Sequence, residues 1–354
     1  MTQPKIPSFD PAAARWRRLG PVAGQPGLDK AGSVCGDPCV VWDEEEGLWR
    51  MFLFQSPPGH GQAVCRDRGD PGPGNWEFLG PLAFENPRAL LGGETHKPFV
   101  VLKPDGGNQA ARVHGRFCLL TVSFLDRRKV LQRAWSEHLA GPWTLESEPL
   151  LEAGIGGDFD ARHQDAVSGY YFEERDELYV FYMGYPLKAQ PQALSPFGSA
   201  QALAVQGPDD TRPRKCGIIL PPSAQKGHWA SGWVGGFQIF PGKKHAWVGL
   251  ANASPSAPDP GGSEVSREEP PPSLGGFAYT DDASARGGWR WFERPLERVE
   301  DLPREAQEWG EGVNLWRQHL LSLPGGRRLL LYNSGSYGYE RLFAQETRDA
   351  DLKI

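Results

Sequence analysis

The stretch AVSGYYFEERDELYVFYMGY (residues 166–185) decides the fold that we expect for this chain. Two runs rich in β-branched and aromatic residues flank a short charged segment, which is typical of two antiparallel strands joined by a turn. The second run recurs elsewhere, each time behind another apolar strand and a turn rich in glycine or charge. The recurrences are WRMFLF (49–54), RFCLLTVSF (116–124), HAWVGLANA (245–253) and RLLLYNSGS (328–336). The sequence therefore predicts a series of β-hairpins of one kind.

A third strand follows each hairpin, and a fourth strand with a tryptophan near its start follows most of them. The third strands are expected at 61–67, 129–136, 201–206, 275–282 and 340–346. The fourth strands are expected at 75–83, 142–151 and 289–296, with a weaker candidate at 215–222. Four-stranded units spaced roughly 60–80 residues apart predict an all-β, five-bladed β-propeller with four-stranded blades.

The last unit has no fourth strand of its own, and the N-terminal region supplies a candidate. RWRRLGPVA (15–23) matches NWEFLGPLA (75–83) at its Trp, Leu, Gly and Pro residues. An N-terminal strand that completes the last blade closes the ring and covers two sheet edges at once. We therefore expect residues 1–354 to form a single propeller domain.

Composition narrows the classes of partner. The chain has 38 Lys and Arg against 44 Asp and Glu, and no basic cluster alternates with aromatics, so no nucleic acid is expected. No apolar run reaches about 18 residues, and the N-terminus lacks the apolar core of a signal peptide, so no membrane partner is expected. The five cysteines have no zinc-site spacing and suit free thiols in a reducing cytoplasm. We expect a cytoplasmic protein of unspecified oligomeric state.

In a propeller the first strand of each blade lines the central channel, so the residues that start these strands converge on one mouth. Counting back from the second strands puts the following residues at equivalent positions: Asp37, His96 with Lys97, Asp165, Gly235, and Arg317 with Gln318. Further polar and aromatic side chains come just before them: Glu94, Asp158, Asp160, His163, Trp229, Trp233, Glu311, Asn314 and Trp316.

These residue types suit carbohydrate chemistry. Paired carboxylates cleave glycosidic bonds when one activates water or attacks carbon and the other protonates the leaving oxygen. Trp faces can stack on sugar rings, and cations can hydrogen-bond to hydroxyls. The candidate catalytic residues are Asp37, Asp165, Glu94, His96 and His163. The candidate substrate-binding residues are Lys97, Asp160, Trp233, Glu311 and Arg317.

Structural roles stay open for the same residues. An Asp before Pro often starts a strand or a turn, and the histidines can be hydrogen-bonded loop residues. Lys97 and Arg317 can form structural ion pairs with the same carboxylates. The loop carboxylates can be solvated, and the tryptophans can pack between blades. The apparent equivalence of Asp37 and Asp165 on separate blades favours a shared site for these two.

The strand motifs resemble those of five-bladed glycoside hydrolases of families 32, 43, 68 and 117. The similar stretches are GDPCVVWDEEEGLWRMFLFQ (36–55), AWSEHLAGPWTL (134–145), DFDARHQDAVSGYYFEERDELYVFYMGY (158–185) and LLLYNSGSYGYERLFAQ (329–345). The resemblance implies that Asp37 acts as base or nucleophile and that Asp165 tunes and orients the acid. The chain departs from the family at the start of the fourth blade, WASGWVGG (229–236), which carries no Glu. Because a His replaces the acid in some relatives, the resemblance leaves this role open among His96, His163, Glu94 and Glu311.

The sequence thus predicts a glycoside hydrolase-like enzyme that acts on a small sugar or glycoconjugate in the channel. Two alternatives stay open: a lyase, isomerase or cyclase on the same scaffold, and a non-catalytic carbohydrate-binding propeller. We expect no cofactor and no specified metal site. A structural Ca²⁺ held in the channel by oxygen ligands is compatible with the sequence.

Overall fold

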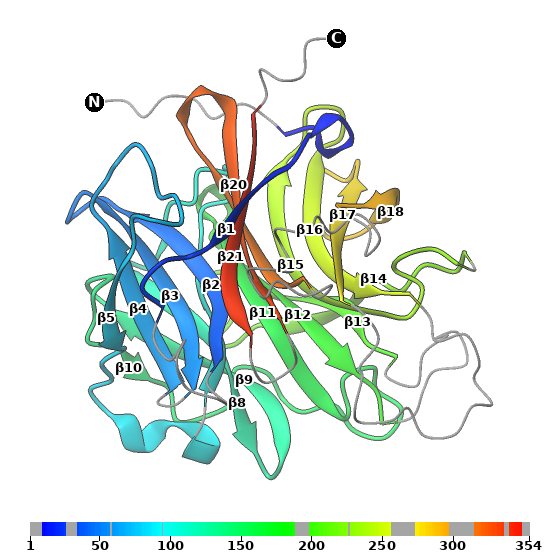
Figure 1. The fold of residues 1–354 in the computed structure, drawn as a ribbon. Coiled ribbons are helices and arrows are strands. Elements are labelled where there is room, and N and C mark those ends of the chain that lie inside the picture. The colour runs from blue at the N-terminus through cyan, green and yellow to red at the C-terminus, as the bar shows by residue number, and fades with distance from the viewer. Residues whose placement is uncertain are drawn as a thin grey trace.

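The computed structural model describes residues 9–25, 34–56, 59–93, 95–187, 198–225, 227–255, 273–296, 315–335 and 340–348. Its strands form five antiparallel sheets (Figure 1). The first strand of each sheet contacts the first strands of the two neighbouring sheets, so the sheets close into a ring. The prediction of an all-β, five-bladed propeller is therefore confirmed. That residues 1–354 form a single domain stays a prediction.

Each blade is a four-stranded meander, and the strand order in the first four follows the chain. Blade one comprises β2 (Val34–Asp43), β3 (Leu48–Ser56), β4 (Gly59–Cys65) and β5 (Glu77–Pro81). Blade two comprises β6 (Thr95–Val100), β8 (Arg116–Leu125), β9 (Arg128–Ser136) and β10 (Thr144–Leu145), with β7 (Arg112–Val113) paired to β8. Blade three comprises β11 (His163–Phe172), β12 (Glu177–Tyr185), β13 (Ala200–Gln206) and β14 (Arg214–Leu220). Blade four comprises β15 (Trp233–Pro241), β16 (Trp247–Ser254), β17 (Leu274–Thr280) and β18 (Arg290–Pro295).

Blade five comprises β19 (Trp316–Ser322), β20 (Arg327–Ser334), β21 (Arg341–Arg348) and, from the other end of the chain, β1 (Arg17–Pro21). Short 3₁₀ turns are η1 (Pro11–Ala13), η2 (Pro87–Ala89), η3 (Leu91–Gly93), η4 (Glu173–Arg175) and η6 (Pro324–Gly326). In the part of the chain that the structure describes, no helix is long and apolar enough to cross a membrane.

The N-terminal strand closes the ring, as predicted. β1 pairs antiparallel with β21 and lies along it in Figure 1. The Leu-Gly-Pro match between β1 and β5 has a structural cause, because both outer strands shift register at this point. Gly20 and Gly80 have φ angles of 88° and 95° there, a backbone conformation that glycine adopts at little cost.

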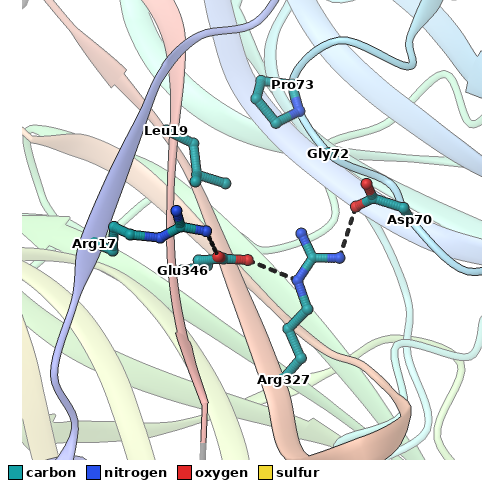
Figure 2. Close-up of a pocket in the computed structure, with 7 residues that line it drawn as sticks. All are labelled: Arg17, Leu19, Asp70, Gly72, Pro73, Arg327 and Glu346. Atoms are coloured by element: carbon teal, nitrogen blue, oxygen red, sulfur yellow. Dashed lines mark hydrogen bonds and ion pairs between the residues drawn. The ribbon is translucent and has the colours of Figure 1, made fainter. Parts of the chain in front are cut away.

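Charged residues fasten the closing strand to its neighbours. Arg17 and Arg327 both pair with Glu346, and Arg327 Nη1 also lies 2.6 Å from Asp70 Oδ1 in the loop between β4 and β5 (Figure 2). With Leu19, Gly72 and Pro73, these residues line an open pocket. Since the two arginines and the two carboxylates neutralise one another, we assign this pocket to the closure of the ring.

The core lies between neighbouring blades and is mostly aromatic and aliphatic. Tyr170 of β11 accepts a hydrogen bond from the backbone N–H of Ile239 in β15 at 2.9 Å, and the rings of Phe181 and Phe237 lie 5.4 Å apart. All five cysteines are free thiols, as the sequence predicts, and only Cys216 is exposed.

A loop of blade two crosses the ends of the inner strands. The side chain of Asn108 donates to the carbonyl of Leu320 and accepts from the N–H of Ser322, each at 3.1 Å. Its own carbonyl accepts from the N–H of Trp42 at 3.0 Å. Asn108 is 2% exposed, so these bonds hold blades one, two and five together at this end. The candidate functional residues lie at the opposite end, where the inner strands start.

Candidate functional site

Each inner strand carries a β-bulge close to its start. The register shifts lie at Gly36/Cys39, His96/Phe99, Asp165/Ser168, Gly235/Phe237 and Trp316/His319. One residue of each bulge has a left-handed backbone, with φ between 46° and 62°: Asp37, Lys97, Ala166, Gly236 and Arg317. This conformation is costly for residues other than glycine, and such residues cluster at functional sites. Three of these positions nevertheless carry charged side chains, which marks this end of the channel as the candidate site.

The bulges correct two predicted equivalences. The counterparts of Asp37 are Ala166 on blade three and Gly236 on blade four, while Asp165 and Gly235 lie one residue earlier, level with Gly36 and His96. The prediction that Asp37 and Asp165 occupy equivalent positions is therefore wrong by one residue. The two hairpins have turns of equal length, since Asp43 pairs with Leu48 and Phe172 with Glu177, so Ala166 stands as far before its turn as Asp37 does. The Pro that follows both Asp37 and Lys97 marks the correct register.

Asp37 is held in place by an asparagine from blade five. Asn333 Oδ1 accepts from the backbone N–H of Asp37 at 2.6 Å, and Asn333 Nδ2 donates to Asp37 Oδ1 at 3.0 Å. A Cβ at Gly36 would collide with the Asn333 side chain, which explains the glycine before Asp37. Asp37 is 6% exposed, so both of its bonds to Asn333 are shielded from water.

The same arrangement repeats one blade earlier. Asn252 of β16 accepts from the backbone N–H of Arg317 at 2.9 Å. An asparagine on the second strand of a blade thus anchors the bulge of the next blade. Sequence reasoning missed both asparagines, which pair with the residue before the left-handed position of their own blade, Gly235 for Asn252 and Trp316 for Asn333.

Asp165 binds two lysines at once. Its Oδ1 lies 2.5 Å from Lys97 Nζ, and its Oδ2 lies 2.7 Å from Lys129 Nζ. Burial alone would raise the pKa of Asp165, but the ammonium groups of Lys129 and Lys97 outweigh burial and hold that pKa well below its usual value. Asp165 is therefore a fixed negative charge at neutral pH. Sequence reasoning missed Lys129, because it reaches Asp165 from the third strand of blade two.

Arg317 reaches across the mouth from blade five to blade three. Its Nη2 donates to the carbonyl of Val167 at 3.2 Å. Burial lowers the pKa of Arg317, and the negative charges of Asp37 and Asp165 act in the opposite direction. We call Asp37, Lys97, Lys129, Asp165 and Arg317 the bulge cluster. The structure thus brings together four of the predicted residues and adds Lys129.

The two candidate histidines border this cluster. His163 Nδ1 accepts from the backbone N–H of Lys129 at 3.2 Å. Burial, Lys129 and Arg162 together lower the pKa of His163, so its ring is neutral at pH 7 and carries its proton on Nε2. The ring of His96 stacks on Phe54 with centroids 4.4 Å apart.

Other predicted residues do not join the bulge cluster. Asp160 is bonded within blade three, where its Oδ2 lies 2.7 Å from Lys215 Nζ and also accepts from Gln164 and Tyr182. Trp233 and Trp316 are half-buried first residues of β15 and β19. Trp229 is buried and packs with Ala230, Ala253 and Leu274. Glu94 and Glu311 lie outside the described residues.

Nothing in the described ranges assembles a metal centre, since no three His, Cys, Asp or Glu side chains gather there in an arrangement that could hold an ion. The bulge cluster instead offers two carboxylates with different surroundings. Asp165 is neutralised by lysines, whereas Asp37 is hydrogen-bonded by a neutral amide. Such a difference between two carboxylates is what separates their roles in acid–base chemistry.

Comparison with known proteins finds likeness in structure only. No family model matches the sequence, and neither does any curated protein. A thermostable family-43 glycoside hydrolase superposes with a TM-score of 0.59 at 14% identity, over 89% of each chain. A family-117 glycoside hydrolase from the marine bacterium Zobellia galactanivorans gives 0.58 at 10% identity, over 98% of this chain and 93% of that one.

An α-L-arabinofuranosidase from Podospora anserina, solved in complex with cellotriose, gives a TM-score of 0.55 at 12% identity, over 95% of this chain and 97% of that one. Superpositions at identities this low establish a common fold only. The activity has to be argued from the site. The chain is therefore an all-β, five-bladed propeller that resembles the glycoside hydrolases of families 43, 62 and 117 in structure.

Proposed function

We propose that this chain is a glycoside hydrolase-like enzyme that acts on a small sugar or glycoconjugate at the mouth formed by the five bulges. The observation that carries the proposal is Asp37, a buried carboxylate held at a left-handed bulge by Asn333. A hydrolase needs such a group to take a proton from water or to attack the sugar carbon. The likeness to glycoside hydrolases, some of them solved with oligosaccharides, supports a carbohydrate ligand.

Asp37 suits the role of base better than Asp165 does. Both oxygens of Asp165 are bonded to ammonium groups, and its Oδ1 also accepts from the N–H of Ala166 at 2.7 Å. Asn333 contacts Oδ1 of Asp37, and no described residue hydrogen-bonds to its Oδ2. That oxygen is therefore the atom to accept a proton. Asp165 would serve as the fixed charge that holds Lys97 and Lys129 beside the substrate.

A second candidate is elimination by the same base. The start of blade four, residues 229–236, carries no Glu that could serve as the acid, and cations outnumber carboxylates in the bulge cluster. A lyase removes a proton from carbon, and a neighbouring cation stabilises the negative charge that develops. Asp37 and Arg317 together have the chemistry for this step.

The test compares the wild type with Asp37→Asn on a panel of aryl furanosides and pyranosides. Loss of the base should lower the rate by about 10²–10⁴-fold. Asp43→Asn is the matched control, because Asp43 is also buried, lies at the other end of β2 and pairs with Arg50. The folded fraction of Asp43→Asn should turn over the active glycosides at the wild-type rate.

Equal rates for the wild type and Asp37→Asn would refute the assignment of the base. Mass spectrometry of the products separates the two reactions. Hydrolysis adds water across the broken bond, whereas elimination leaves a C=C bond and adds none.

We also propose that the protein works in the cytoplasm. The support is chemical, since all five cysteines are free thiols and four of them are buried. Fractionation of the source cells with an antibody against the chain would test this, and recovery outside the cytoplasm would contradict it.

A further inference from the structure

Positive charge outweighs negative charge in the bulge cluster, and it gathers on one side of the mouth. Lys97, Lys129 and Arg317 stand against Asp37 and Asp165, which leaves one positive charge in excess. All three cations reach blade three. The two lysines meet Asp165, and the Arg317 guanidinium meets the carbonyl of Val167, two residues further along β11.

Hydrogen-bond donors are also in excess on this side. Of the three N–H groups of Lys97 Nζ, described residues engage one, through Asp165. Of the five side-chain N–H groups of Arg317, described residues likewise engage one, through Val167. The Lys97 side chain is 21% exposed. A ligand that accepts hydrogen bonds would satisfy both residues.

The bulges next to these donors carry the smallest residues of the ring. The left-handed positions of blades three and four are Ala166 and Gly236. A Cβ at Gly236 would lie 2.9 Å from Asn252 Oδ1 and 3.7 Å from Arg317 Nη1. The glycine therefore lets the Asn252 amide and the Arg317 guanidinium lie close to this bulge.

We propose that this side of the mouth binds an oxyanion with a single negative charge, a carboxylate or a sulfate ester, carried by the sugar substrate. The inference rests on the proposed function, which makes the ligand a sugar. It adds that this sugar carries a negative charge. One negative charge balances the excess in the cluster, and the planar fork of a guanidinium matches two oxygens of a carboxylate or sulfate. Lys97 supplies a second contact from blade two.

The test measures binding by calorimetry at low salt, with matched pairs of ligands. The pairs are glucuronate against glucose, galacturonate against galactose, and galactose 6-sulfate against galactose. In the wild type an anionic sugar should bind at least tenfold more tightly than its neutral partner. Arg317→Gln should weaken that binding by about ten- to hundredfold, since a charge-assisted hydrogen bond is lost. Arg317→Lys, which keeps the charge, should fall between the two.

Arg286→Gln is the matched control. It removes the same charge from a residue that pairs with Glu177 and Tyr179 and is 45% exposed, so anion binding should not change. Lys97→Gln is the second variant and should also weaken binding of the anionic sugar. Circular dichroism shows whether each variant is folded. The preferred pair tells whether the oxyanion is a carboxylate or a sulfate.

Three outcomes would overturn the inference: no binding of any anionic sugar at millimolar ligand, equal binding of both members of every pair, or unchanged binding in folded Arg317→Gln and Lys97→Gln. Its failure is separable from that of the proposed function. Turnover of neutral glycosides that depends on Asp37, together with equal binding of both members of every ligand pair, would leave the function standing and refute the charge preference. Tight binding of an anionic sugar with no turnover would do the reverse.

Discussion

Replacing Asp165 with Asn tests how the bulge cluster is held together. The change keeps the shape of the side chain and removes the charge that Lys97 and Lys129 share. An amide oxygen can still accept from one ammonium group, but the amide nitrogen then faces the other one. Burial already lowers the pKa of Lys97, so its charged form becomes harder to keep once Asp165 is neutral.

The size of the effect follows from burial. Asp165 is 1% exposed, while the side chains of Lys97 and Lys129 are 21% and 31% exposed. Each charge-assisted hydrogen bond contributes roughly 1.5–3 kcal/mol, and water can replace part of what the lysines lose. We expect the apparent free energy of unfolding to fall by about 3–5 kcal/mol at neutral pH.

The dependence on pH has a definite sign. The pKa of Asp165 is lower in the folded chain than in the unfolded chain, where it is about 3.9. The stabilisation is therefore fully present above that unfolded value and is lost as pH falls toward the folded value. The difference between wild type and variant should be constant from about pH 8 to 5 and about 1.3 kcal/mol smaller at pH 3.

Urea unfolding followed by tryptophan fluorescence measures this difference at each pH. Asp160→Asn is the matched control, because Asp160 is also buried in blade three but pairs with one ammonium group, that of Lys215. It should lose roughly half as much stability. Asp165→Asn within about 1 kcal/mol of the wild type at neutral pH, or a gap that does not narrow at pH 3, would refute the reasoning.

Two further substitutions test residues that the sequence did not single out. Asn333→Ala removes both contacts that hold Asp37, so kcat on an active substrate should fall at least about tenfold with little change in KM; a change in KM alone would contradict a positioning role. Asn108→Ala removes buried hydrogen bonds to Leu320 and Ser322, so urea unfolding should show a loss of about 2–4 kcal/mol; an unchanged midpoint would contradict this.

The blades could be predicted from the sequence because their signals are local. Alternation of apolar residues and the turns between them are properties of adjacent residues, and they located the hairpins. The weak candidate strand at 215–222 is confirmed as β14, and the Leu-Gly-Pro match correctly paired the N-terminal strand with the last blade. The repeated glycine of that match lies at a register shift that β1 and β5 each carry against their own partner strand.

The candidate site could be predicted only in part. The starts of the inner strands converge in any propeller. Counting back from the second strand of each hairpin therefore placed Asp37, Lys97, Asp165 and Arg317 at one mouth. The predicted equivalence of Asp165 with Asp37 was wrong by one residue. Lys129 and Asn333 were not predicted, because each contacts its carboxylate from a neighbouring blade and a single hairpin motif does not contain that packing.

By itself the sequence determined the order of the strands, the closure of the ring and the residue types at one mouth of the channel. The tertiary structure decided which charges meet. Lys97 lies 68 residues from Asp165, and Asp37 lies 296 residues from Asn333. Such pairs form only when separate blades are packed side by side, so their distances, and the contrast between a lysine-bound Asp165 and an asparagine-bound Asp37, follow from the packing of the ring.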